Sequence, residues 1–225
     1  MKMLDLGLNQ DSMLTMASLI VAVVIALLGF PGIYNKWQER KKEKELKSQL
    51  ESSIRDADAL SDSGEYTEAI NRYDGVLKTI SPQKYPYQWG NCKNSIGMAY
   101  YNLSLINNQE LNIKRGIQAY QEALMVYTID RYPINYAITQ NNLGGAYVAL
   151  SEIRGKEDNL EKAIGAFKEA LKIYTIDGRP IYYAGTQNNL GAAYRALSEV
   201  RGKEDNLEKA IDAYKNALKV YTIDG

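Results

Sequence analysis

Hydrophobic positions between residues 132 and 176 recur at the spacing of α-helices. Over 132–152 one face carries Leu143, Ala146, Tyr147 and Leu150. Over 160–176 a second apolar face contains Ala163, Ile164, Phe167, Ala170, Leu171 and Tyr174. The pattern predicts two helices joined by a turn at Gly155. A lone hairpin of this kind cannot bury both of its faces, so further copies are expected to stack on it.

The same pattern is repeated along the chain with an offset of 47 residues. Segments 139–177 and 186–224 match at 32 of 39 positions. The register extends to an earlier copy through the columns Asn94/Asn141/Asn188, Gly97/Gly144/Gly191 and Tyr100/Tyr147/Tyr194. Tyr66, Ala69 and Tyr73 mark a shorter copy before these three. The sequence therefore predicts one repeat domain over 51–225, divided into hairpins at 51–84, 85–131, 132–178 and 179–225.

The turns of the predicted hairpins have their own sequence signals. Asp158 and Glu161 have the spacing of a capping box at the start of the second helix, and Gly155 marks the turn before it. Pro133 and Pro180 suit the first turn of a helix. The string Arg-Gly-Lys-Glu-Asp-Asn, which begins at Arg154 and again at Arg201, lacks the second glycine and the hydroxyl of a phosphate-binding loop. It is interpreted as a turn of mixed charge.

The motif Asn-Asn-Leu-Gly-x-Ala-Tyr at 141–147, followed by Leu-Glu-Lys-Ala-Ile-x-x-Phe-x-x-Ala-Leu at 160–171, resembles the tetratricopeptide repeat. Segment 52–82 is similar to the ordinary 34-residue form. The later copies resemble the long, asparagine-containing variants found in kinesin light chain and in microbial signalling arrays. The resemblance implies an all-α, right-handed solenoid of about four hairpins. It also implies that the chain binds a protein or peptide and performs no chemistry itself.

In this family the first helix of each hairpin lines a concave surface, and the resemblance assigns that surface to residues of three hairpins. They are Asn94, Tyr101 and Asn102; Asn141, Asn142 and Val148; and Asn188, Asn189 and Arg195. An amide offers a donor and an acceptor, so a row of them suits the backbone of an extended peptide. This resembles the asparagine ladder of the O-linked N-acetylglucosamine transferase solenoid. The alternative is that one amide of each pair bonds the neighbouring hairpin and only fixes the repeat join.

The polar residues just before the asparagine pairs are not expected to bind a ligand. The pairs Thr139-Gln140 and Thr186-Gln187 are expected near the start of the first helix, as exposed or capping residues. Among the many tyrosines, Tyr101 and either Tyr182 or Tyr183 are expected to be accessible for ligand contact.

The N-terminal region has a long segment without charge. Residues 13–30 carry no ionisable side chain, and the segment extended to 33 is long enough for a transmembrane helix. A cleaved signal peptide is the alternative, but the basic n-region and cleavage site are lacking. Basic residues gather after the segment, in the predicted charged helical stalk 34–50. The sequence thus predicts a single-pass cell-membrane protein with residues 1–12 outside, a membrane contact at 13–33 and a cytoplasmic repeat array.

Composition excludes several classes of function. The chain has 27 basic and 27 acidic side chains, so no net field favours nucleic acid. It has no histidine and one cysteine, so neither a metal site nor histidine-based catalysis is expected. Cys92 is expected to be a small buried hydrophobe. No cofactor and no enzymatic activity are predicted.

The leading hypothesis is a membrane-anchored adaptor whose repeat array binds a protein or peptide in its concave groove. One alternative is a membrane scaffold that self-associates through its last hairpin, because the side of that hairpin with Ala210, Tyr214 and Ala217 is expected to lack a successor. Another alternative is the sensor half of a larger signalling or protease protein, since Gly225 occupies the place of Gly178, after which the earlier copy continues.

Overall fold

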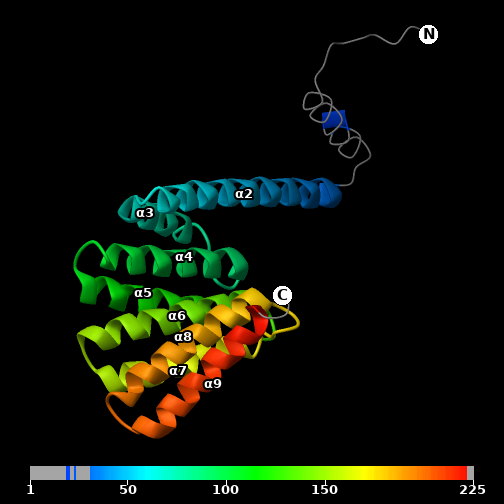
Figure 1. Ribbon diagram of the computed structural model, residues 1–225. Coiled ribbons are helices and arrows are strands. Elements are labelled where there is room, and N and C mark those ends of the chain that lie inside the picture. The colour runs from blue at the N-terminus through cyan, green and yellow to red at the C-terminus, as the bar shows by residue number, and fades with distance from the viewer. Residues whose placement is uncertain (1–18, 21–22, 24–30, 222–225) are drawn as a thin grey trace. The chain divides into compact units, whose positions relative to one another are not determined.

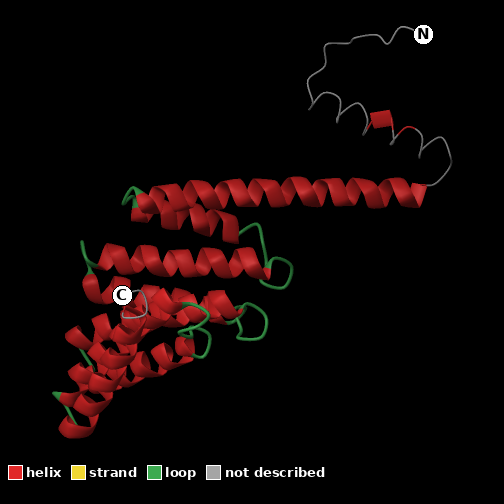
Figure 2. Ribbon diagram, turned by 45° about the vertical axis from the view of Figure 1, so that its right-hand side comes forward, coloured by secondary structure: helices red, strands yellow, loops and turns green. Residues whose placement is uncertain are grey.

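The computed structural model describes residues 19, 20, 23 and 31–221. These residues form helices and short connecting loops, and no strand occurs among them (Figures 1 and 2). The chain divides into two compact units, one ending at Glu51 and the other beginning at Ser52. The division falls inside the helix α2, Pro31–Asp62.

Further helices follow α2, and from α4 onward they are paired as consecutive hairpins. They are α3 (Tyr66–Leu77), α4 (Pro86–Ser104), α5 (Gln109–Leu124), α6 (Pro133–Ile153), α7 (Lys156–Leu171), α8 (Pro180–Ser198) and α9 (Lys203–Tyr221). Within the second unit, α4 packs on α5, α6 on α7 and α8 on α9. Each hairpin also packs on the next, because α5 contacts α6 and α7 contacts α8 (Figure 1). This stacking is consistent with a solenoid, whereas the exact repeat limits stay predictions.

The membrane part of the predicted fold is wrong. Among the described residues no helix is both long and apolar enough to cross a bilayer. Residues 13–18, 21–22 and 24–30 of the predicted span, like residues 1–12, lie outside the described part. From Pro31 onward the chain belongs to α2, which continues through the charged segment 36–47 and is therefore not an apolar helix. The single-pass topology, the cell-membrane localisation and the cytoplasmic placement of the array depended on this span and are corrected with it.

The turn inside each of the three later hairpins contains a residue in the left-handed conformation. Gly155 and Gly202 have φ of 56° and 54°, and Asn108 takes the equivalent place with φ of 43°. Glycine and asparagine are the residues that adopt this conformation most readily. The sequence correctly placed the turn at Gly155.

The second helix of these hairpins begins earlier than predicted. It starts at Lys156 rather than near 160, so Asp158 lies inside the first turn and forms no capping box. A buried asparagine closes the turn instead. The side-chain nitrogen of Asn159 donates to the carbonyl oxygen of Arg154 at 2.9 Å, and Asn112 and Asn206 make the same bond in their own hairpins.

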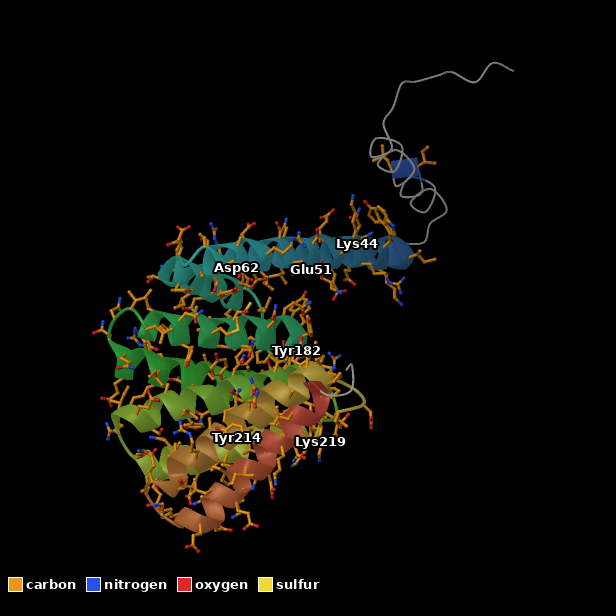
Figure 3. All side chains as sticks on the ribbon, in the orientation of Figure 1. Lys44, Glu51, Asp62, Tyr182, Tyr214 and Lys219 are labelled. Atoms are coloured by element: carbon orange, nitrogen blue, oxygen red, sulfur yellow. The ribbon has the colours of Figure 1, made fainter. Side chains whose placement is uncertain are left out.

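Glycine and a facing aromatic ring set the close approach of the two helices in a hairpin. A Cβ added at Gly144 would lie 2.6 Å from Cε1 of Phe167, which is closer than real contacts allow. Gly97 faces Tyr120 and Gly191 faces Tyr214 in the same way. Phe167 is buried in a cluster that joins α7, α8 and α9. Tyr214 lies midway along α9 (Figure 3).

The turns are also linked to each other by ion pairs. Arg154 pairs with Glu110 of the preceding hairpin at 2.9 Å, and Arg201 pairs with Glu157 at 2.7 Å. The guanidinium of Arg201 also contacts the carboxylate of Glu161. These side chains are about half exposed, so solvent screens the ion pairs and they add little to stability. Their geometric effect is to align successive turns along one edge of the repeat domain.

Candidate functional site

The asparagine column lies on the first helices of three successive hairpins. Asn94 is in α4, Asn141 in α6 and Asn188 in α8, and α6 contacts both α4 and α8. Asn94 and Asn141 are half-buried, and Asn188 is exposed. We refer to these three residues as the asparagine row.

Asn94 and Asn141 each accept a hydrogen bond from the next hairpin through the side-chain oxygen. Thr139 Oγ1 donates to Asn94 Oδ1 at 3.1 Å, and Thr186 Oγ1 donates to Asn141 Oδ1 at 3.1 Å. Asn189 Nδ2 also donates to Asn141 Oδ1, at 3.3 Å. The oxygens therefore connect hairpins, whereas the Nδ2 groups of Asn94 and Asn141 bond no other described residue.

The threonines are the residues whose position was wrongly predicted. Thr139 and Thr186 are 0% and 2% exposed, and Gln187 is buried as well. They were expected to be exposed or capping residues. Burial of a hydroxyl is tolerated here because each one has a partner in the neighbouring hairpin. Their recurrence two residues before Asn141 and Asn188 was the signal that could have identified them.

The remaining predicted site residues differ in accessibility. Arg195 and Asn189 are exposed, and Asn102 is half-buried. Tyr101 and Val148 are half-buried and pack partly against the hydrophobic core. Asn142 is half-buried, but its Nδ2 atom is buried without a partner, so it does not face a ligand in this conformation. Among the predicted site residues, Asn188, Asn189 and Arg195 are thus exposed, and Asn94, Asn102 and Asn141 are partly accessible.

Aromatic residues gather at the loops that connect the hairpins. Tyr182, which lies at the start of α8 (Figure 3), is 53% exposed, and its ring stacks on Tyr174 with a centroid distance of 5.2 Å. The guanidinium of Arg179 lies 5.9 Å from the Tyr182 ring centroid. Tyr182 was predicted to be accessible, and it is.

Burial raises the pKa of two side chains in this part of the molecule, Cys92 and Tyr174. Cys92 is fully buried, as predicted, and burial raises the pKa of its thiol to about 12, so the thiol stays protonated. Burial likewise raises the pKa of Tyr174 to about 12. Across residues 31–221 and the three described residues before them, no group of His, Cys, Asp and Glu side chains is arranged to hold a metal ion.

A family model described as tetratricopeptide repeat matches residues 184–220, which fall within α8 and α9. The hairpin of α8 and α9 is thus similar to a tetratricopeptide repeat, and the stacked helical hairpins before it are consistent with the same type of repeat. No curated protein matches its sequence. The finer resemblance to kinesin light chain is not confirmed. Tetratricopeptide repeats are typically non-catalytic modules of protein-interaction scaffolds, and this is the class of function that the match supports.

Proposed function

We propose that the chain is an adaptor whose tetratricopeptide repeats bind an extended peptide along the asparagine row. The proposal depends on one observation: in Asn94 and Asn141 the side-chain oxygen is bonded within the protein, whereas the side-chain nitrogen is not. The oxygens of Asn94 and Asn141 are held by threonines of the next hairpin, which fixes the side chains. The Nδ2 groups are left to donate hydrogen bonds, and Asn188 is exposed at the end of the row. Donors fixed at repeat spacing suit the carbonyl oxygens of an extended backbone.

Aspartate substitutions test the proposal because they keep the oxygen and remove the donor. Alanine at Asn94 or Asn141 would leave a buried threonine hydroxyl without its acceptor, at a cost of about 1–3 kcal/mol, and would confuse binding with stability. The triple variant Asn94→Asp, Asn141→Asp, Asn188→Asp retains an acceptor for each threonine. We expect it to melt within a few degrees of the parent protein. We also expect its Kd for 12-residue peptides selected from a random library to rise at least thirtyfold.

Asn135→Asp is the matched control, since Asn135 is a half-buried asparagine at the start of α6. It lies six positions before Asn141, which places it about 120° away around the helix. It adds a charge without touching the row, so its peptide affinity should equal that of the parent. Equal affinity for the triple variant, measured by calorimetry with the same peptides, would refute the role of the row.

We infer self-association through α9 as a second candidate function. The reason is that Ile211 of α9 is far more exposed than the isoleucines at the equivalent positions of α5 and α7. Ile117 in α5 and Ile164 in α7 are 8% and 7% exposed, whereas Ile211 in α9 is 52% exposed. Ile164 packs against Leu190 and Tyr194 of α8 within the core. An isologous contact between two α9 helices would cover Ile211 in the same manner.

Light scattering of the full chain over a wide concentration range tests this second candidate. We expect the mass to rise toward that of a dimer with increasing concentration, and Ile211→Glu to abolish the rise. Leu105→Glu is the control, because Leu105 is an exposed apolar residue on a different hairpin. A constant monomer mass for the parent chain would contradict self-association, and it would leave the peptide proposal unaffected.

A further inference from the structure

An apolar hollow lies where the loop before α4 meets the loop after α5. Its volume is about 540 Å³, within the usual range for ligand pockets. It lies entirely within the second compact unit. Its lining residues are Pro82, Gln83, Trp89, Glu122, Met125, Val126, Thr128 and Arg131. We refer to it as the Trp89 hollow.

The Trp89 hollow is separate from the asparagine row. Trp89 and Asn94 are both in α4, and their offset of five positions places them about 140° apart around the helix. The rest of the lining comes from α5 and from the two loops rather than from the first helices of later hairpins. A ligand in the hollow therefore does not compete with a peptide on the row.

Comparison with the next hairpin shows why the hollow is open and apolar. Tyr136, Glu169 and Lys172 stand 47 residues after Trp89, Glu122 and Met125. In that hairpin the Tyr136 hydroxyl donates to Glu169 at 2.7 Å, and Lys172 pairs with Glu169 at 2.6 Å. In the hairpin of the hollow this cross-link is missing, because Glu122 bonds Lys93 and Gln118 instead and Met125 has no charged group. Met125 is instead 75% exposed, and Trp89 presents an apolar ring to the hollow.

The charges around the hollow favour an anionic group. Glu122 is neutralised by Lys93, whose ammonium lies 2.5 Å from the carboxylate. Burial opposes ionisation of Glu122, but Lys93 and Gln118 outweigh burial and keep its pKa below the usual value. Arg131 packs over the Tyr132 ring at 5.4 Å, and no carboxylate of the described residues pairs with its guanidinium. One uncompensated positive charge therefore borders an apolar surface.

We propose that the Trp89 hollow binds a peptide segment in which a large apolar side chain adjoins a carboxylate. The apolar side chain fills the space between Trp89, Met125 and Val126. The carboxylate forms a charge-assisted hydrogen bond with Arg131. The protein thus has a second peptide-binding surface on the opposite side of α4 from the asparagine row, and the two surfaces can be occupied together.

Binding is measured by tryptophan fluorescence in the full chain. Trp37, the other tryptophan, is first replaced by Phe, so that the signal comes from Trp89 in the hollow. The probes are 3-phenylpropionate, which combines a phenyl group with a carboxylate, and its neutral amide, 3-phenylpropanamide. We expect a saturable change in Trp89 fluorescence with 3-phenylpropionate, with a Kd of about 1 mM for a ligand of this size. The amide should bind about fivefold to tenfold more weakly, because it lacks the charge that Arg131 pairs with.

Two substitutions separate the contributions of charge and space. Arg131→Gln should bring the affinity for the acid down to that of the amide and leave amide binding unchanged. Met125→Lys supplies the lysine of the next hairpin next to Glu122 and should abolish binding of both probes. Arg179→Gln is the control, since Arg179 also covers a tyrosine ring but does not line the hollow. Absence of any saturable change at 20 mM probe would overturn the proposal, as would equal binding of acid and amide or an Arg131→Gln variant that binds the acid as the parent does.

Discussion

Replacing Gly144 by Ala is expected to lower the free energy of unfolding by about 2 kcal/mol, because one methyl group would overpack the contact between α6 and α7. The added Cβ would lie 2.6 Å from the Phe167 ring, which is buried and cannot move aside. The higher helix propensity of alanine offsets part of this loss. Chemical denaturation followed by circular dichroism measures the change.

The neighbouring glycine provides a matched control for this substitution. Gly145 is in the same helix, and a Cβ added there meets no atom within 4 Å. Gly145→Ala should therefore raise the free energy of unfolding by about 1 kcal/mol through helix propensity alone. If both variants shift stability in the same direction, close packing against Phe167 is not the reason for a glycine at 144.

Replacing Phe167 by Ala is expected to have the largest effect, a loss of about 3–5 kcal/mol. Phe167 is 1% exposed and packs with residues of α7, α8 and α9, so its removal leaves a cavity where two hairpins meet. In a repeat protein, stability is transmitted through contacts between neighbours. Amide hydrogen exchange should accordingly show a large loss of protection in α8 and α9 and a smaller loss in α4 and α5.

Tyr214→Ala is the comparison for Phe167→Ala, since Tyr214 occupies the equivalent position of α9 and is only half-buried. Its loss should cost less than half as much, because less apolar surface returns to water. Equal losses for the two variants would show that the contact between hairpins adds nothing to the contact within each hairpin.

The sequence was sufficient to predict the helical hairpins. The apolar face with Leu143, Ala146 and Leu150 is buried, as the 3.6-residue period indicates. The start of α7 was missed because Asp158 and Glu161 have the spacing of a capping box, whereas the left-handed Gly155 places the helix start at Lys156. Spacing alone does not distinguish a residue before the first turn from one inside it.

Contacts between hairpins were the least predictable part of the candidate site. Thr139 reaches Asn94 across 45 residues, and only the stacking of α6 on α4 brings them together. The ion pairs of Arg154 and Arg201 were missed for the same reason, since their string was interpreted as an isolated turn. The membrane span was inferred from the length of the uncharged segment and the basic residues after it, but no helix among the described residues is long and apolar enough to cross a bilayer.

The near identity of α7 and α9 has a kinetic consequence for folding. Both helices present Ala, Ile and an aromatic ring at the same positions, so α9 is able to take the place of α7 against α6 while the intervening segment forms a loop. Closing a loop of this length costs only a modest entropy. Such a mispaired chain is compact and must open before the correct neighbours can meet. We therefore expect the interactions that make the repeats stack so regularly to slow folding as well, by favouring this mispaired state.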